Sequence, residues 1–259
     1  MFAQRALLCL PLLYLPLLPA EESVQLYVAN APPLTQPFEE HARGMVGDVV
    51  LAALQRAGYS VQLKVEPWAR TQVKVSRGTD LLMAPQSRVP EREDAFTWIA
   101  EIMLLERVFF TLEPSLTSFA EARQRYRKVA IARGTAQEQM LLNEGFSNEQ
   151  IVDLQFGESA LRMLELGRVD AWFTSVPEGL RQWPESERAR LHVGPVLASS
   201  GLYLACSKIC DEKLVRRLRE SVEALRAEGL LARIQEGYWK ELQGRRPVGA
   251  TPSAQRESP

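Results

Sequence analysis

The residues best suited to bind a charged small molecule lie in the stretch SRVPEREDAF, which runs from Ser87 to Phe96. It holds two arginines and three acids, and only Gln86 separates it from the apolar run LLMAP. A guanidinium group donates two parallel hydrogen bonds to a carboxylate, and this pair is strong where water is excluded. The alternative is that Arg92 forms exposed ion pairs with its acidic neighbours. The choice depends on where the fold places the stretch.

The elements before this stretch alternate between strands and helices. Strands are expected at 24–30, 60–66 and 80–84, because each is short and either apolar or alternating in polarity. A helix is expected at 44–57, where apolar residues recur at helical spacing before Gly58. Another is expected at 67–78, where Pro67 suits the first turn and Gly78 ends the segment. The order β-α-β-α-β predicts a parallel sheet with right-handed crossovers.

The pattern restarts after a long apolar segment at 96–112, which exceeds the length of an average strand. Strands and helices then alternate at 128–135, 136–145, 152–157, 158–167 and 169–175. A second long, strand-like segment spans 191–208, and helical patterns follow it to the end of the folded chain. The two long segments are expected to carry the chain from one sheet to another and back.

This arrangement predicts an α/β protein of two lobes, each a mostly parallel sheet flanked by helices, joined by two crossing segments. Lobe 1 is expected to comprise 21–107 and 199–243, and lobe 2 to comprise 108–198. Residues 244–259 are polar and rich in Pro, Gly and Ser, which predicts a disordered tail. In open α/β sheets, ligands bind beyond the carboxyl ends of the strands, and the stretch SRVPEREDAF follows one such end.

The composition argues against strongly charged partners. The chain has 259 residues, 46% of them hydrophobic, and a formal net charge of −1. This is enough apolar content for one large core or two modest ones. The sequence has neither the basic stripe of a nucleic-acid binder nor a polybasic membrane anchor. We therefore expect a globular protein that binds no nucleic acid.

The N-terminus has the layout of a secretory signal peptide. One positive charge at Arg5 precedes an apolar run from Ala6 to Leu18, and Ala20 stands before an acidic pair. The prolines in the run and its short length argue against a stable membrane span. Residues 1–20 are therefore expected to be a signal peptide that exports the mature chain to the periplasm.

Export bears on the cysteines that remain after cleavage, Cys206 and Cys210. An oxidising compartment favours a short-loop disulfide between them, and the alternative is a pair of reduced, partly buried thiols. The two histidines, His41 and His192, are near neither a cysteine nor an acidic cluster in the sequence. No metal site is expected.

The order and spacing of several segments resemble family 3 of the bacterial extracellular solute-binding proteins. The segments are GDVVLAALQRAGYSVQLKVEPWAR, RGTDLLMAP, PEREDAFTW, KVAIARGTAQE, GRVDAWFTS and AEGLLARIQEGYW. The similarity covers about Val24 to Leu242, and no single motif in it is diagnostic. It implies a type II periplasmic-binding fold and a receptor for polar amino acids or related solutes.

The resemblance also implies a set of ligand contacts. In that family, an arginine a few residues after the third strand holds the ligand α-carboxylate, and Arg92 matches it. Ser87, five positions earlier, matches a polar residue that adds a hydrogen bond. From the other lobe, Gly134 and Thr135 match a turn at a helix start, where backbone N–H groups favour an anion.

One position departs from the family. An aspartate after the VDA-type strand usually holds the ligand ammonium, and here Ser175 stands at that position. A neutral hydroxyl does not balance a buried ammonium, whose burial without a counter-charge is costly. The resemblance therefore predicts recognition of a carboxylate and leaves open whether the ligand is an amino acid.

Three further residues complete the predicted site. Asn30 ends the first strand, and Trp68 and Arg70 stand at the mouth of a helix. The face of a tryptophan ring holds organic cations or flat rings. Packing in the core or between the lobes is the alternative for Trp68.

These features predict a monomeric periplasmic receptor, without a cofactor, that closes around a small carboxylate-bearing solute. It would serve ABC-type uptake with an inner-membrane permease. No enzyme is expected, because the two histidines build no nucleophile-and-base set. Two alternatives stay open: a cyclohexadienyl dehydratase-like enzyme with Glu158 as its acid, or a sensory or accessory module without transport. A helix-capping role is the simpler account of Glu158.

Overall fold

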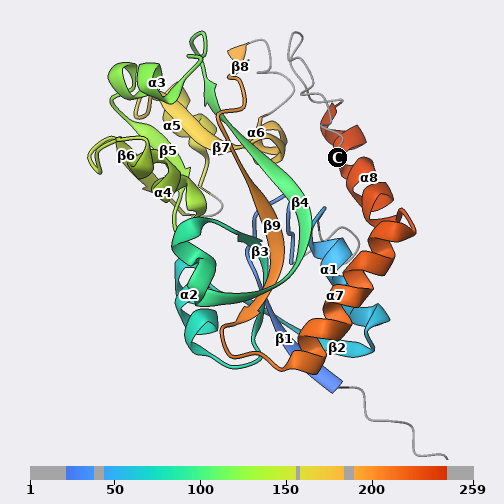
Figure 1. The fold of residues 1–259 in the computed structure, drawn as a ribbon. Coiled ribbons are helices and arrows are strands. Elements are labelled where there is room, and N and C mark those ends of the chain that lie inside the picture. The colour runs from blue at the N-terminus through green and yellow to red at the C-terminus, as the bar shows by residue number, and fades with distance from the viewer. Residues whose placement is uncertain (1–21, 38–43, 156–157, 184–189, 244–259) are drawn as a thin grey trace, which may run out of the picture.

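The computed structural model describes residues 22–37, 44–155, 158–183 and 190–243 (Figure 1). The expected signal peptide at 1–20 and the expected tail at 244–259 lie outside these residues. The strands are β1 Glu22–Val28, β2 Tyr59–Val65, β3 Leu82–Ser87, β4 Phe96–Thr111, β5 Val129–Ala132, β6 Ile151–Leu154, β7 Ala171–Ser175, β8 His192–Val193 and β9 Ala198–Ser207. The α-helices are α1 Gly47–Arg56, α2 Trp68–Arg77, α3 Phe119–Arg125, α4 Ala136–Asn143, α5 Ala160–Glu165, α6 Val176–Gln182, α7 Glu212–Ala227 and α8 Leu230–Gln243.

The strands form one sheet in the order β2-β1-β3-β9-β4-β7-β5-β6, with β8 beside β4. At one end β1 pairs in parallel with β2 and β3, and at the other β5 pairs in parallel with β6 and β7. The antiparallel strands β4 and β9 run between these two sets, as Figure 1 shows. The predicted two-lobed α/β architecture with two crossing segments is confirmed. Below, lobe 1 means the part around β1–β3, and lobe 2 the part around β5–β7.

β4 belongs to both lobes. It pairs with β9 from Phe96 to Arg107 and with β7 from Arg107 to Phe110. The two expected sheets therefore join into one strand path at Arg107. The residue boundaries expected for the lobes stay a prediction.

The second crossing segment is shorter than the expected run at 191–208. Pro195 cannot donate a backbone hydrogen bond, and the segment divides there into β8 and β9. The intervening chain still follows β4, because Gly194 donates to the Phe109 carbonyl at 2.9 Å and Leu197 to the Arg107 carbonyl at 3.0 Å.

Two short helices, α3 and α6, were not anticipated from apolar periodicity. Both start at a serine followed three residues later by a glutamate, the spacing of a capping box. The Ser118 hydroxyl accepts from the Glu121 amide at 3.2 Å, and the Ser175 hydroxyl accepts from the Glu178 amide at 3.4 Å. The stretch after β3 is also more ordered than a loop, since Pro90–Ala95 forms a 3₁₀ turn, η1.

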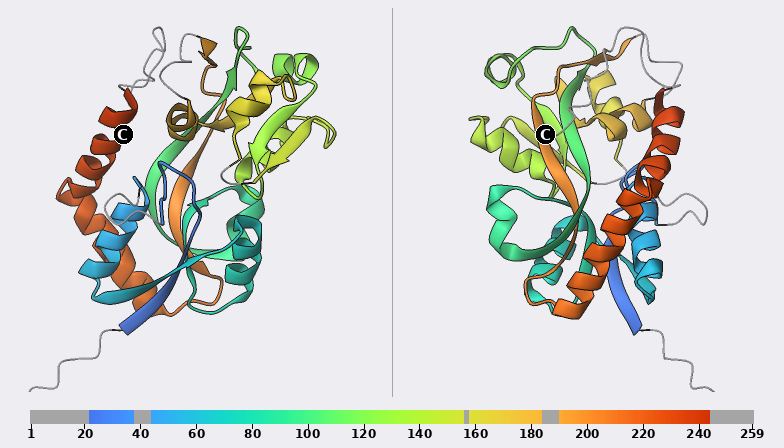
Figure 2. Two further views of the ribbon diagram at one scale, coloured as in Figure 1. Left: turned by 180° about the vertical axis from the view of Figure 1, so that it is seen from behind. Right: turned by 45° about the vertical axis from the view of Figure 1, so that its right-hand side comes forward.

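Helices cover both faces of the lobe 1 sheet, with α1 and α7 on one side and α2 on the other (Figure 2). Alternate residues of β1 serve the two faces, as the strand period requires. Leu26 and Val28 join the cluster beneath α1 and α7, whereas Tyr27 packs in the cluster beneath α2. Phe109 and Phe110 of β4 likewise belong to two different clusters of lobe 2.

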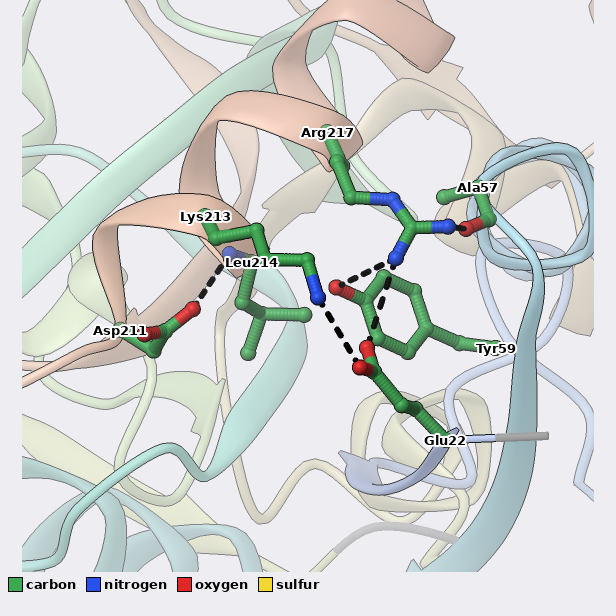
Figure 3. Close-up of polar contacts among 7 residues, drawn as sticks. All are labelled: Glu22, Ala57, Tyr59, Asp211, Lys213, Leu214 and Arg217. Carbon is green, nitrogen blue, oxygen red and sulfur yellow. Dashed lines mark hydrogen bonds and ion pairs between the residues drawn. The ribbon is translucent and has the colours of Figure 1, made fainter. Parts of the chain in front are cut away.

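The start of α7 is tied to the edge of the lobe 1 sheet (Figure 3). Asp211 caps the helix, and Lys213 lies 3.0 Å from the Glu22 carboxylate. Arg217 reaches both Glu22 and the Tyr59 hydroxyl at 3.4 Å, with its guanidinium over the Tyr59 ring. The hydrogen bond and charge of Lys213 lower the pKa of the Glu22 carboxyl. Such exposed pairs contribute little stability individually, so they orient the helix more than they hold it.

None of the described helices combines the length and apolar character needed to cross a lipid bilayer.

Cys206 and Cys210 are joined by a disulfide at the end of β9, with their Cα atoms 6.2 Å apart. Cys206 is fully buried in the lobe 1 core, and Cys210 packs against the same cluster. The bond therefore fastens the chain between β9 and α7 to the core.

Reducing this disulfide should lower the free energy of unfolding by about 2 kcal/mol, because the short loop restrains the unfolded chain only modestly. Urea unfolding of the purified protein with and without dithiothreitol measures the effect. The double variant Cys206→Ser/Cys210→Ser should not respond to the reductant. Identical curves for the wild-type protein in both conditions would contradict the prediction.

Candidate functional site

Arg92 lies in η1, directly beyond the end of β3, and its side chain crosses to lobe 2. Its Nη2 donates to the Gly134 carbonyl at 3.2 Å, and its Nη1 to the Gln86 side chain at 3.4 Å. Gln72 of α2 donates to the same Gly134 carbonyl. The structure thus brings two predicted site residues, Arg92 and Gly134, into direct contact across the lobes.

The approach of the lobes at Gly134 requires a glycine. Its φ is +75°, a conformation that side-chain-bearing residues rarely adopt. A Cβ atom there would lie 3.0 to 3.1 Å from Cβ, Cα and N of Ala69, at the start of α2. A second contact between the lobes lies nearby, since Asn143 of α4 donates to Glu91 at 2.8 Å.

Thr135 follows Gly134 at the N-cap of α4 but does not cap the helix with its side chain. Its hydroxyl donates instead to the Ala132 carbonyl at 2.6 Å. The Gly-Thr turn is therefore held against its own strand, with the helix start directly behind it.

Arg107 is the second arginine at the lobe junction, and its side chain is almost completely buried. It donates to the hydroxyls of Ser87 and Ser200 at 2.9 Å and to the Leu105 carbonyl at 3.3 Å. Its Nε has no partner among the described residues. The predicted contact Ser87 is the last residue of β3, not part of a loop, and its hydroxyl already binds Arg107.

Ser175 and Glu178 lie beside Arg107. Ser175 is the cross-strand partner of Arg107, and its hydroxyl donates to the Glu178 carboxylate at 2.5 Å. The Thr174 hydroxyl lies 3.3 Å from the same oxygen. The sequence showed that Ser175 itself is not an acid. The structure adds that a buried carboxylate, that of Glu178 in the first turn of α6, lies next to it.

Burial dominates the electrostatics of these three ionisable groups. It lowers the pKa of Arg92 to about 10 and that of Arg107 to about 10, since desolvation disfavours the charged guanidinium. It raises the pKa of the Glu178 carboxyl, against the opposing effects of the Ser175 hydrogen bond and the Arg107 charge. Among the described residues, no carboxylate lies within 4.0 Å of either guanidinium.

Three other predicted residues differ in burial. Asn30 and Arg70 are exposed, and Trp68 is buried in the cluster that contains Val75 and Met83. Trp68 and Arg70 flank Ala69, which lies against Gly134, and the predicted contacts of all three residues with a ligand stay predictions. Glu158 is also exposed and accepts a hydrogen bond from the Gln155 amide at 2.6 Å.

Comparisons with known proteins agree on the fold. Neither a protein-family model nor a curated protein sequence matches the chain. A histidine kinase sensor domain with similarity to periplasmic binding proteins superposes with a TM-score of 0.74 at 17% identity, over 84% of this chain and 96% of that one. EhuB in complex with hydroxyectoine gives 0.74 at 21% identity, over 89% and 95%. The ancestral amino acid-binding protein AncCDT-1, a precursor of cyclohexadienyl dehydratase, gives 0.69 at 17% identity, over 83% and 94%.

This chain has the type II periplasmic-binding fold. At these identities the likeness concerns the fold, and the residues at the lobe junction must be assessed on their own chemistry. In this fold β4 and β9 carry the chain between the lobes, so Arg107 and Ser200 on them lie where the lobes meet.

Arg107 and Glu178 are two charged junction residues that were missed from the sequence. Arg107 stands in the apolar run LLERVFF, where it resembles an outward-facing strand residue next to Glu106. Glu178 could have been found, because the Ser175–Glu178 spacing indicates a helix start immediately after a buried strand. Burial of its carboxylate follows only from the packing of α6 against β4 and β7.

Replacing Glu178 with glutamine should change how stability depends on pH. A carboxyl whose pKa is raised on folding holds its proton in the folded state while the unfolded state ionises, so stability falls as pH rises above 4.5. Glutamine cannot ionise, so the stability of Glu178→Gln relative to wild type should increase between about pH 5 and pH 8. Melting temperatures across this range test the effect. The exposed-site variant Glu158→Gln is the control, and a pH-independent difference for Glu178→Gln would refute the assignment.

Proposed function

We propose that the protein is a periplasmic receptor that closes around a small carboxylate-bearing solute and holds the carboxylate with Arg92. The main support is the state of the Arg92 guanidinium at the lobe junction. It is desolvated there, and its two hydrogen-bond acceptors, the Gln86 side chain and the Gly134 carbonyl, are both neutral. A ligand carboxylate would supply the missing counter-charge through a charge-assisted bond.

The lowered pKa of Arg92 supports this role. Its nearest acids, Glu91 and Glu138, act on it only through their charge and do not overcome the effect of burial. The cost of this desolvation is present in the ligand-free protein and is recovered when an anion binds. The position of Arg92 after β3 and the desolvation of its guanidinium thus both support it as the carboxylate-binding residue.

The contacts between lobes suggest how binding and closure are linked. Arg92 and Glu91 from lobe 1 reach Gly134 and Asn143 of lobe 2, so η1 contacts the partner lobe directly. A ligand held by groups from both lobes binds the closed form better than the open one and shifts the population toward it. Ser87, Thr135 and the start of α4 are proposed as further contacts.

Transport and sensing are both compatible with this proposal. EhuB in complex with hydroxyectoine and a histidine kinase sensor domain share the fold with similar TM-scores. We favour ABC-type uptake by a monomeric receptor that delivers its solute to an inner-membrane permease. Export by the segment 1–20 belongs to the same proposal.

One observation favours a second candidate, a cyclohexadienyl dehydratase-like enzyme. The buried Glu178 has a raised pKa, which suits a general acid, and Arg107 lies within the range of its charge. AncCDT-1, which shares the fold, is described as a precursor of such an enzyme. For this role we therefore propose Glu178 as the acid, in preference to Glu158, which was the candidate from the sequence.

Incubation of the purified protein with prephenate or arogenate separates the candidates. Formation of an aromatic product that Glu178→Gln abolishes, while Glu158→Gln retains it, would establish the enzyme. The receptor proposal expects no turnover of either compound, because binding and hinge closure need no proton transfer.

Replacing Arg92 with alanine should weaken solute binding by at least about 30-fold, because it removes a buried charge-assisted contact. Arg88→Ala is the matched control, since Arg88 lies in the same stretch but pairs with Glu93 and stacks over Trp98 and Tyr203. A thermal-shift screen of amino acids, organic acids and small amines identifies solutes, and calorimetry compares the variants. Equal small losses from Arg92→Ala and Arg88→Ala would refute the site.

A further inference from the structure

Arg107 carries a buried charge that the fold leaves without a close counter-ion. Its three acceptors are two serine hydroxyls and a backbone carbonyl, all of them neutral. The acid whose charge acts on it is Glu178, and among the described residues no carboxylate forms an ion pair with Arg107. The Nε–H is buried with no partner. An unsatisfied buried donor in a native fold calls for an explanation, and a group that arrives with a ligand is one.

The second guanidinium, that of Arg92, belongs to the same electrostatic neighbourhood. The charge of Arg92 lowers the pKa of Arg107, so the two groups repel each other in a desolvated setting. Both side chains bind the end of β3, because Arg107 donates to the Ser87 hydroxyl and Arg92 donates to the Gln86 side chain. An anion near both guanidinium groups would favour their charged forms.

The charges around Arg107 give the sign of the missing partner. Glu91 and Glu138 act through their charge on Arg92, whereas Glu178 is the acid whose charge acts on Arg107. Glu178 already accepts bonds from Ser175 and Thr174, and burial favours its protonated, neutral form. The Arg107 side of the junction therefore keeps a positive charge, and a ligand with a single carboxylate, held by Arg92, would leave that charge in place.

We infer that Arg107 is a second anion-binding residue of this site, and that the preferred solute carries two anionic groups, as a short dicarboxylate does. One carboxylate binds Arg92 and the other binds the Arg107 side of the junction. This inference rests on the proposed receptor function and narrows its class of solute.

A purely structural role for Arg107 explains its hydrogen bonds but not its buried charge. The residue does link the ends of β3, β4 and β9 through its serine contacts. A neutral side chain would link them without a buried charge, since replacing buried charges by uncharged groups is often neutral or stabilising. The unpaired Nε and the nearby charge of Arg92 are costs that such a role leaves unexplained.

Matched ligand pairs test the inference in the wild-type protein. Calorimetry compares short dicarboxylates, malonate to adipate, with their monoamides, and glutamate with glutamine, since each amide removes one charge and little volume. At least one dianion should bind about 10-fold to 100-fold more tightly than its own amide, the loss expected for one hydrogen bond to a charged group. Equal affinities within every pair, or no binding of any dianion, would overturn it.

Variants of Arg107 locate the preference. Arg107→Gln keeps donors for the two serines but removes the charge, so it should bind the dianion no more tightly than the amide. Arg107→Lys, which keeps the charge, should retain part of the preference, whereas Arg88→Gln should retain all of it. A preference that survives in folded Arg107→Gln would overturn the inference. If that variant does not fold, the Arg107→Lys and wild-type comparisons decide in the same way.

The design separates this inference from the function on which it rests. If monoanions bind as tightly as dianions and Arg92→Ala abolishes both, the receptor function stands and only the second anion site fails. If no small molecule in the wider screen raises the melting temperature, the receptor function itself fails.

Discussion

At Arg107, β4 stops pairing with β9 and begins pairing with β7. This change of partner joins the parallel strands of one lobe to those of the other, so the geometry of the junction depends on it. It also sets Arg107 opposite Ser175 on one side and within reach of Ser200 on the other. The course of the single long strand β4 therefore positions Arg107 at the junction, and groups from lobe 1 and lobe 2 surround it.

The same strand places charge where charge is costly. A lobe core stabilised by apolar burial has no need of a guanidinium, and desolvation penalises one unless a partner compensates it. Arg107 and the nearby Arg92 are exceptions in this fold, because each lies among neutral acceptors. Stability alone does not account for keeping both. The anion site proposed above would account for them, since the cost of desolvation is recovered when an anion binds.

Much of the fold could be predicted from the sequence, because strands and helices of lobe 1 follow local apolar periodicity and end at glycines. Arg92 could be placed for the same reason, since a position after a parallel strand is local information. Arg107 could not, because its burial depends on two long-range pairings that an apolar run does not specify. The short helix α6 was missed as its length gives little periodicity, although the Ser175–Glu178 spacing signalled its start. The roles considered for Trp68 and Glu158 were based only on their positions at helix starts. Their surroundings depend on contacts that these positions do not specify: Trp68 packs in a core cluster, and Glu158 accepts a hydrogen bond from the Gln155 amide.

The pair Ser175 and Glu178 changes what the departure at Ser175 means. β7 ends at Ser175 and not at an acid. The Ser175 hydroxyl nevertheless donates a hydrogen bond to a carboxylate, that of Glu178 in the first turn of α6. That carboxylate is buried, bonded to two hydroxyls and shifted toward its neutral form, whereas an acid poised for an ammonium ion must stay ionised. An acid shifted toward its neutral form in this way is a weaker partner for a cation than an ionised carboxylate would be. Next to two guanidinium groups, the balance of the junction moves further toward anions.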